Sequence, residues 1–353
     1  MTRRRFNYID LLRALAIFAV LLVHSHVAKY YAETGNVFSQ FMSVTLGMIS
    51  GLGVPLFFMI SGALLLGREE SYKDVLMRVL RIIVVLIGFS FIQYIFFGGQ
   101  PELATFEGWR HRIIEIFNDK GPIEFIAYFF RYIWSKPVTT QYWYLYAYID
   151  MLLLMPLLRK VCKAMDKNLF IYILAGMVLF VGVLPEMCKI LNLDDLNINF
   201  TILENVIAYP LLGYYISHEE DIEKSKVKTC GLILGVFFLV NAIAYLLEYN
   251  IAGLEYFRPN VFVAPFVVFV FCAARKFEWN SKGNKVIYWI SSASFGIYLT
   301  EFILHAFTLD IYQKSLSYMP YLLATCLRNL VSIAIGTVIF NLAKKIKLVR
   351  TFI

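Results

Sequence analysis

Charged residues are scarce in this chain. Only 16% of its 353 residues are Asp, Glu, Lys or Arg, whereas 59% are hydrophobic. Soluble globular proteins carry about a quarter charged residues, so this composition excludes an ordinary soluble domain and indicates a polytopic membrane protein.

Cysteine is also scarce. No CxxC pair or metal-ligand spacing occurs, so we expect dispersed thiols and no metal site at Cys162, Cys188, Cys230, Cys272 and Cys326.

The chain also lacks a signal-peptide cleavage site behind its basic start. Residues 3–5 are all arginine, but the hydrophobic stretch that follows is too long for a signal-peptide core and contains no small-residue cleavage motif. We therefore expect it to remain as a membrane span. Apolar runs then recur to the end of the chain, which predicts one integral membrane domain over residues 1–353 with no soluble appendage.

A membrane span needs about 20 apolar residues. By that rule the sequence predicts an all-α bundle of ten transmembrane helices, at 8–27, 43–66, 81–99, 141–160, 168–185, 200–217, 228–247, 259–275, 286–309 and 318–343. Lysine and arginine gather in alternate connecting segments, namely 3–5, 68–81, 159–167, 224–228, 275–285 and 344–350. The positive-inside rule then predicts that both termini are cytoplasmic. Anchoring to anionic membrane lipids explains the net charge of +8 without a nucleic-acid partner.

The connecting segment at about 100–140 contains an apolar stretch that is too short to span the membrane. Residues 122–134 are rich in aromatic and aliphatic side chains but include Glu124 and Arg131. This pattern favours an amphipathic helix lying at the outer interface. Two roles fit it: a membrane anchor, or a lid over a substrate site.

The first predicted span contains three ionisable residues, Asp10, Arg13 and His24. An Asp or Arg at the centre of a membrane helix costs about 2.5–3.5 kcal/mol, so such residues usually have a function. Asp10 and Arg13 are spaced to form an ion pair. Arg13 and His24 share a helix face and are roughly 16 Å apart along the axis. The structural alternative is a buried ion pair with an interfacial histidine.

The ninth predicted span places Glu301 and His305 one helical turn apart, on one face. From the predicted topology we expect Glu301 to lie near the depth of His24. A carboxylate and an imidazole at that depth could transfer a proton between them, and the alternative is an ordinary interhelical contact. Three further ionisable residues fall within predicted spans and are candidates for the same polar region: Asp150, Glu204 and Arg328.

Two more patterns lie at the ends of spans. Arg78 and Arg81 are three residues apart at the cytoplasmic start of the third span. Both the helix dipole and the guanidinium groups favour binding of a phosphate there. The alternative is that the two arginines only anchor the topology of the span. Trp143 and Tyr144 begin the fourth span, either as part of an interfacial aromatic belt or as a surface on which sugar rings stack. In the second span, glycines and Pro55 are expected to loosen the helix.

The order of these motifs resembles acyltransferase family 3, whose members transfer acyl groups to cell-envelope glycans and related acceptors. The matching stretches are residues 9–16 with His24, Val54–Gly62, Arg78–Arg81, Tyr142–Tyr146 and Ser294–Leu299. The resemblance implies that the donor is a cytosolic acyl-CoA, typically acetyl-CoA. It also implies that Arg13 and His24 are the essential pair and that Arg78 and Arg81 contact the donor.

The expected function is therefore membrane acyl transfer, in particular O-acetylation of an envelope or lipid-linked glycan at a bacterial plasma membrane. Asp10 and Glu301 complete the expected catalytic set, and Tyr298 and His305 join the aromatic pair as expected acceptor contacts. The chain departs from the family pattern at Glu301, where a histidine usually follows the Tyr-Leu-x motif. A lipid or small-molecule carrier and a ligand-sensing membrane domain remain alternative functions.

Overall fold

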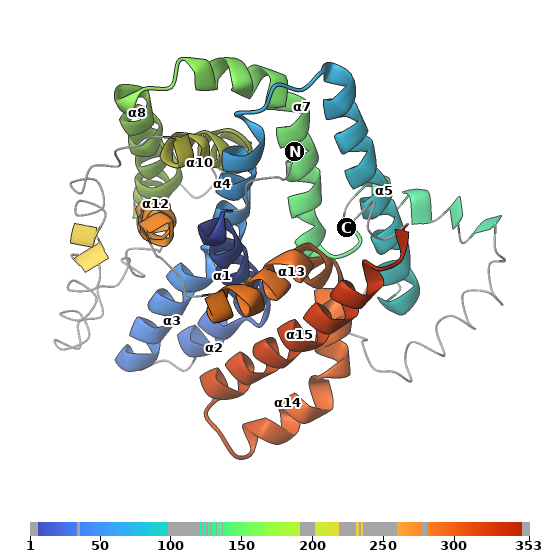
Figure 1. The fold of residues 1–353 in the computed structure, drawn as a ribbon. Helices are drawn as coiled ribbons and strands as arrows, with labels where there is room; N and C mark the ends of the chain where they lie inside the picture. The colour runs from blue at the N-terminus through green and yellow to red at the C-terminus, as the bar shows by residue number, and fades with distance from the viewer. Residues whose placement is uncertain are drawn as a thin grey trace. The chain divides into compact units, whose positions relative to one another are not determined.

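The computed structural model describes residues 6–33, 36–97, 121–190 (without 122, 125, 128, 132 and 136), 202–218, 231–235 (without 233), 260–276 and 281–347. Every regular element in these ranges is a helix, which confirms the predicted all-α class (Figure 1). The chain folds into two compact units. The first unit comprises Met1–Glu69 and Leu154–Ser291, and the second comprises Glu70–Leu153 and Ser292–Ile353.

Among the described residues, five helical segments are long and apolar enough to cross a membrane. They are Asn7–His24, Phe38–Leu65, Tyr72–Ile95, Lys285–Phe307 and Tyr321–Ala343. The other predicted spans that fall on described residues also coincide with helices, but these helices are shorter, interrupted or richer in polar residues. The predicted span 228–247 lies almost wholly outside the described residues. The chain is thus a helical membrane protein, while the count of ten spans and the cytoplasmic termini stay predictions.

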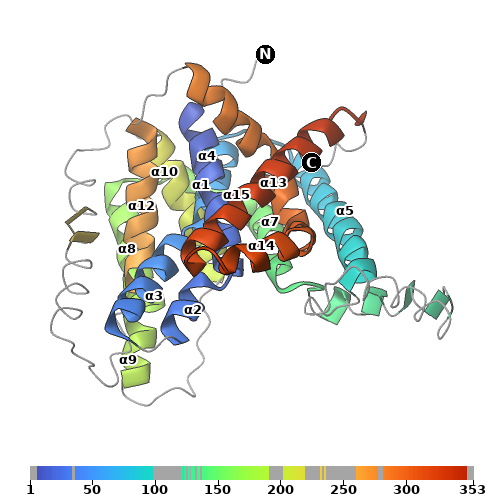
Figure 2. The same ribbon diagram turned by 90° about the horizontal axis from the view of Figure 1, so that it is seen from below.

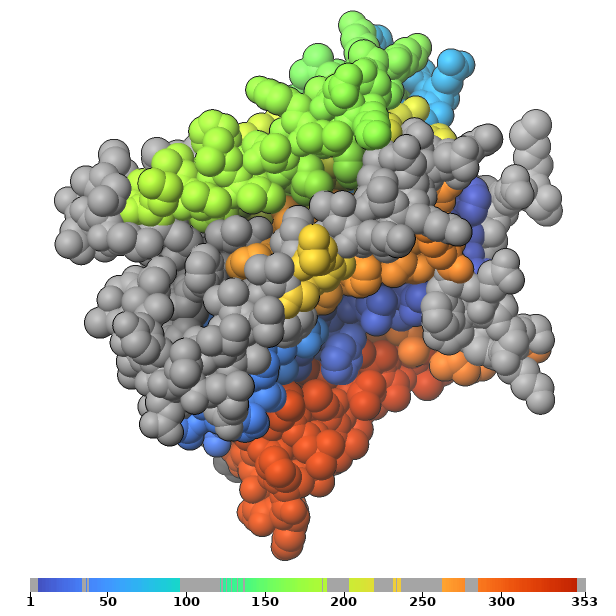
Figure 3. All heavy atoms as spheres, turned by 90° about the vertical axis from the view of Figure 1, so that its left-hand side faces the viewer, coloured from blue at the N-terminus to red at the C-terminus, as the bar shows by residue number. Residues whose placement is uncertain are grey.

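The first unit is built around α1. Its helices are α1 (Asn7–His24), α2 (Val27–Glu33), α3 (Val37–Ser50), α4 (Gly53–Leu65), α8 (Lys167–Met177), η3 (Val178–Val183), α9 (Leu184–Ile190), η4 (Ile202–Ala208), α10 (Tyr209–His218) and α12 (Asn260–Lys276), with the ends of α7 and α13 described below. Helix α1 packs against α3, α4 and α12. The space-filling view shows α12, in orange, next to the blue side chains of α1 and α3 (Figure 3).

Helices α4 and α10 approach each other closely because each presents a glycine to the other. A side-chain carbon at Gly62 would collide with the backbone of Pro210, and one at Gly213 would collide with the backbone of Met59. Small residues allow such close backbone approach between membrane helices, where dispersion contacts replace the hydrophobic effect as the driving force. Gly62, which belongs to the family-like motif of the second span, is therefore a packing residue.

The second predicted span is interrupted at the glycines and proline that were expected to loosen it. Helix α3 ends at Ser50, a turn covers Gly51 and Leu52, and α4 begins at Gly53, with Pro55 in its first turn. Proline removes the N–H that would bond to the carbonyl four residues earlier, and for Pro55 that residue is Gly51. The interruption therefore lies where the sequence predicts it.

The second unit contains α5 (Tyr72–Phe97), η2 (Thr140–Tyr142), α14 (Leu309–Leu316) and α15 (Tyr321–Ala343), together with parts of α7 (Trp143–Lys163) and α13 (Ser281–Phe307), which contribute to both units. Figures 1 and 2 both show α14 lying along α15. Helix α15 packs on α13 through glycines: an added side-chain carbon at Gly296 would meet the Phe340 ring, and one at Gly336 would meet Ile297.

The predicted interfacial segment 122–134 is helical at its described positions. Phe129 is buried and its ring lies 5.2 Å from that of Phe91 and 5.6 Å from that of Tyr94, both on α5. Trp134 and Ile123, by contrast, are almost fully exposed. One side of the segment thus packs on protein while apolar residues remain exposed, which favours the anchor interpretation, since exposed apolar side chains suit a lipid interface.

Candidate functional site

Helix α1 carries Asp10, Arg13 and His24 on one uninterrupted helix. The predicted spacing therefore holds: Arg13 and His24 lie three turns apart on one face. Both are half-buried, and His24 is the last residue of α1. His26, two residues later, is exposed and has a left-handed backbone conformation (φ 52°). His24 therefore belongs to α1, whereas His26 lies in the turn that follows the helix.

Asp10 is held by a distant serine. It is buried, and its Oδ1 accepts a 2.7 Å hydrogen bond from Ser291 Oγ, a residue 281 positions further along the chain. Both residues belong to the first unit. The bond fixes the carboxylate in the first turn of α1, where a negative charge also stabilises the helix dipole. The predicted ion pair between Asp10 and Arg13 stays a prediction.

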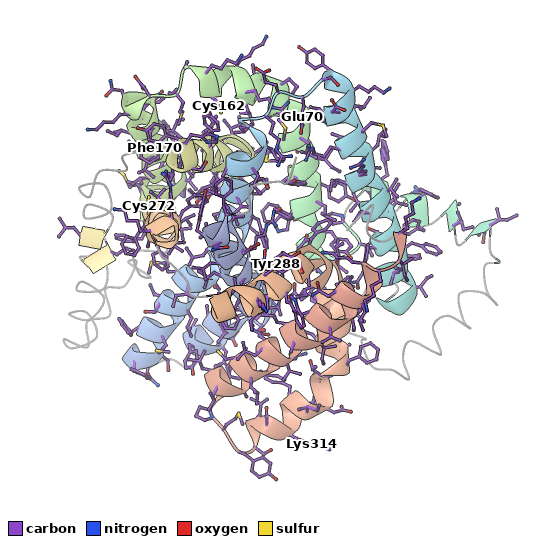
Figure 4. All side chains as sticks on the ribbon, viewed as in Figure 1. Glu70, Cys162, Phe170, Cys272, Tyr288 and Lys314 are labelled. Carbon is purple, nitrogen blue, oxygen red and sulfur yellow. The ribbon has the colours of Figure 1, made fainter. Side chains whose placement is uncertain are left out.

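Arg78 has a partner that the sequence interpretation missed. Its Nη2 donates a 2.6 Å hydrogen bond to Glu70 Oε1. Glu70 precedes α5 and is labelled in Figure 4. The pair is largely buried, and Arg78 Nε is a buried donor with no hydrogen-bond partner among the described residues. Arg81, one turn further along α5, is exposed. The two arginines therefore differ: the Arg81 guanidinium is exposed, whereas that of Arg78 is oriented by a carboxylate.

The second unit contains a buried polar cluster around α13. Tyr298 and Glu301 are both buried, and Glu301 has no exposed surface at all. The Tyr298 hydroxyl donates a 2.5 Å hydrogen bond to the Gln141 carbonyl, and the Tyr142 hydroxyl donates a 2.7 Å bond to the Leu299 carbonyl. The two hydrogen bonds tie η2 to α13, and Glu301 lies one helical turn after Tyr298 on α13.

His305 lies one turn after Glu301 on α13 and is also buried. The carbonyl of His305 accepts a 2.7 Å hydrogen bond from Arg328 Nη2 on α15. Arg328 also lies over the Tyr312 ring, 4.6 Å from its centroid, and donates to Thr308. Its guanidinium therefore stabilises the last turn of α13 through the His305 carbonyl, a common use of arginine at a helix C-terminus.

The aromatic motif at the start of α7 is mostly packed against protein. Tyr144 is buried, stacks on Tyr148 at 5.8 Å and meets the edge of Tyr298 at 5.4 Å. Trp143 is half-buried. Of the other ionisable candidates, Asp150 is exposed, whereas Glu204 accepts a 3.2 Å hydrogen bond from Tyr209 in the first unit. Tyr144 thus belongs to the polar cluster through Tyr298.

Sequence reasoning missed two residues of this cluster, Gln93 and Gln141. Both are fully buried. Gln93 Nε2 donates to the Leu299 carbonyl at 3.3 Å, and its amide also contacts the Tyr142 hydroxyl. The signal was present, because an amide in an apolar span is costly unless it is hydrogen-bonded. A neutral amide carries no charge, so it does not stand out as an ionisable residue does.

The comparison with known families decides the classification. The chain matches the Acyltransferase domain family over residues 6–340, which is nearly its whole length. The chain belongs to acyltransferase family 3. No curated protein and no solved structure matched it. The family assignment confirms the resemblance drawn from the motifs, and it covers both the α1 residues and the polar cluster of the second unit.

The family membership gives these two groups of residues a common context, membrane acyl transfer. The ionisable residues of α1 lie in the first unit, whereas the arginine pair of α5 and the buried cluster around Glu301 lie in the second.

Proposed function

We propose that this protein is an O-acyltransferase that moves an acetyl group from cytosolic acetyl-CoA to a hydroxyl group of an extracytoplasmic or lipid-linked glycan, in a bacterial plasma membrane. The observation that carries the proposal is the family match over residues 6–340. The membrane-length helices and the ionisable residues on α1 support it. A carrier of lipids would not need the arginine pair of α5, and a sensor would need no base on α1.

In the proposed reaction the acceptor hydroxyl oxygen attacks the thioester carbonyl carbon. The new C–O bond forms, the C–S bond breaks, and coenzyme A leaves as its thiol. His24 accepts the proton of the hydroxyl group and returns a proton to the sulfur, as a general base and then a general acid. The alternative order is that His24 receives the acyl group first and passes it to the acceptor. A neutral thioester enters an apolar membrane interior at lower cost than a charged group does.

The arginines of α5 are expected to bind the phosphate groups of the donor. Replacing Arg81 with alanine should raise the KM for acetyl-CoA about tenfold to a hundredfold, because a hydrogen bond to a charged group contributes about 1.5–3 kcal/mol. Replacing Arg78 with alanine should do the same. The measurement is the donor KM of the purified protein in lipid nanodiscs, with acceptor held constant.

Glu70 provides the control for Arg78. Glu70→Gln removes the charge of the ion pair but keeps Arg78. If Arg78 binds donor phosphate, Glu70→Gln keeps or lowers the donor KM while Arg78→Ala raises it. If the two variants raise the donor KM equally, Arg78 acts only as the structural partner of Glu70, and its role in donor binding is refuted.

The proposed function as a whole is tested by following the acyl group. Purified protein should bind acetyl-CoA and release coenzyme A over repeated turnovers only when an acceptor is present. Mass spectrometry of envelope glycans should show an acetyl increment in cells with the intact gene and none in a deletion strain. A glycan profile that is identical in both strains, together with no thioester cleavage, would refute acyl transfer and favour a carrier or sensor.

A further inference from the structure

The buried cluster of the second unit has more hydrogen-bonding groups than the described protein uses. Gln141 is 1% exposed, and neither its Oε1 nor its Nε2 has a hydrogen-bond partner among the described residues. Gln93 is 0% exposed, and its Oε1 is likewise without a partner in the described part of the chain. Buried amides are costly when their polar atoms are unpaired, so such atoms mark a place where a further hydrogen-bonding partner fits.

These amides are held in place by a well-connected framework. The Gln141 backbone carbonyl accepts from Tyr298, and the neighbouring Tyr142 hydroxyl both donates to Leu299 and contacts the Gln93 amide. The Tyr142 and Tyr298 rings are 6.3 Å apart. Hydrogen bonds to α13 thus fix the Gln141 backbone and the neighbouring Tyr142 side chain. The side-chain amide of Gln141 takes no part in these bonds. That combination is typical of a preorganised binding group.

Two hydroxyl groups close in sequence share this property. Ser90 lies one turn before Gln93 on α5, and Thr139 lies two residues before Gln141. Both are buried, and neither side-chain oxygen has a hydrogen-bond partner in the described ranges. The unused groups therefore come in two sets, one on α5 and one at η2, and each set pairs a hydroxyl with an amide.

The chemistry of the unused atoms specifies the ligand. Amide and hydroxyl groups both donate and accept, which matches the hydroxyl groups of a sugar, since each of these also donates and accepts. A buried anionic ligand needs a cation to offset the cost of its desolvation. Arg328, a cation near the end of α13, already binds the His305 carbonyl. A neutral ligand with several hydroxyl groups fits best.

We propose that Gln93 and Gln141, with Ser90 and Thr139, bind the hydroxyl groups of a neutral sugar residue of the acceptor. This inference rests on the proposed acyl transfer, because it names the acceptor's chemical class. The inference favours a neutral glycan over a phosphate-rich polymer as the acceptor, whereas the sequence motifs do not distinguish these two acceptors. Gln93 and Gln141 are assigned to acceptor recognition and not to the bond-breaking step.

The test measures sugar binding separately from turnover. Full-length protein in nanodiscs is titrated with methyl glycosides of glucose, galactose, mannose and N-acetylglucosamine, and with glycerol 3-phosphate as an anionic probe, by saturation-transfer NMR. At least one glycoside should bind, and glycerol 3-phosphate should not. Gln93→Met and Gln141→Met should each weaken glycoside binding by about tenfold or more, because a site built for hydrogen bonds is left with unpaired groups. Binding of none of the glycosides would overturn the inference.

Thermal stability distinguishes a binding role from a structural one. Gln141→Met should keep or raise the Tm, because it removes an amide with no hydrogen-bond partner among the described residues. Gln93→Met also loses the bond to the Leu299 carbonyl, so its Tm is not part of this test. Asn341→Leu is the matched control: its Oδ1 accepts from Ser292 at 2.8 Å and its Nδ2 donates to Thr337 at 2.8 Å, so this change should lower the Tm and leave sugar binding intact. A lower Tm with unchanged sugar binding in Gln141→Met would refute the inference.

The failure of this inference can be told from the failure of acyl transfer. If acetyl-CoA is cleaved and envelope glycan is acetylated equally by wild type and both methionine variants, acyl transfer stands and the sugar site is refuted. If sugar binding is lost in the variants as expected but wild-type protein never cleaves acetyl-CoA, the sugar site stands and acyl transfer is refuted.

Discussion

Replacing His24 with alanine is expected to abolish acyl transfer while the protein remains folded. General acid–base catalysis contributes about a hundredfold to ten-thousandfold in rate, so removal of the base should lower the turnover number by that range. His24 is half-buried at the last position of α1, where the helix is already ending, so little packing is lost. The measurement is transfer of labelled acetyl from acetyl-CoA by protein in nanodiscs, with thermal unfolding of the same sample.

His26 is the control for this change. It lies two residues away, is exposed, and has a left-handed backbone conformation that asparagine tolerates well. His26→Asn should therefore retain the wild-type rate. Full transfer by His24→Ala would remove His24 from the mechanism. Equal loss in both variants would instead indicate that the end of α1 acts structurally.

Replacing Gly62 with leucine is expected to prevent folding of the first unit. Its backbone lies against Pro210, so a side chain there must push α4 and α10 apart. Overpacking typically costs about 1–3 kcal/mol when side chains can shift, and more when the neighbour is backbone. Because total stability is only about 5–15 kcal/mol, the leucine variant should yield little monodisperse protein in size-exclusion chromatography. Gly62→Ala should fold with a lower Tm.

Gly88 on α5 provides the comparison. A side-chain carbon there would meet nothing within 4 Å among the described residues. Gly88→Ala should raise or preserve the Tm, since alanine is favoured over glycine in a helix by about 1 kcal/mol. Gly213→Ala, which faces Met59 across the same contact, should reproduce the loss seen for Gly62→Ala. Wild-type stability of the Gly62 and Gly213 variants would show that α4 and α10 do not pack through these glycines.

The sequence was a good guide wherever the signal is local. Apolar runs predicted the helical segments of α1, α5, α13 and α15 because helix formation and membrane insertion depend on neighbouring residues. The order of the short motifs predicted the family that the comparison confirmed. Spacing along α1 placed Arg13 and His24 on one face, because a helix converts spacing into direction.

Local signals failed where a residue's partner lies far along the chain. Asp10 was expected to interact with Arg13 three positions away, and the structure adds Ser291 as a hydrogen-bond donor.

By itself, then, the sequence determined the membrane class, the all-helical architecture and the family, since hydrophobicity, helix periodicity and short motifs are properties of contiguous residues. The tertiary structure alone decided that Gln93, Gln141 and Tyr298 belong to one buried cluster, and that Gly62 faces Pro210. Those pairings depend on which helix faces pack together. Helix packing is set by many weak contacts between distant segments, and no local spacing encodes it.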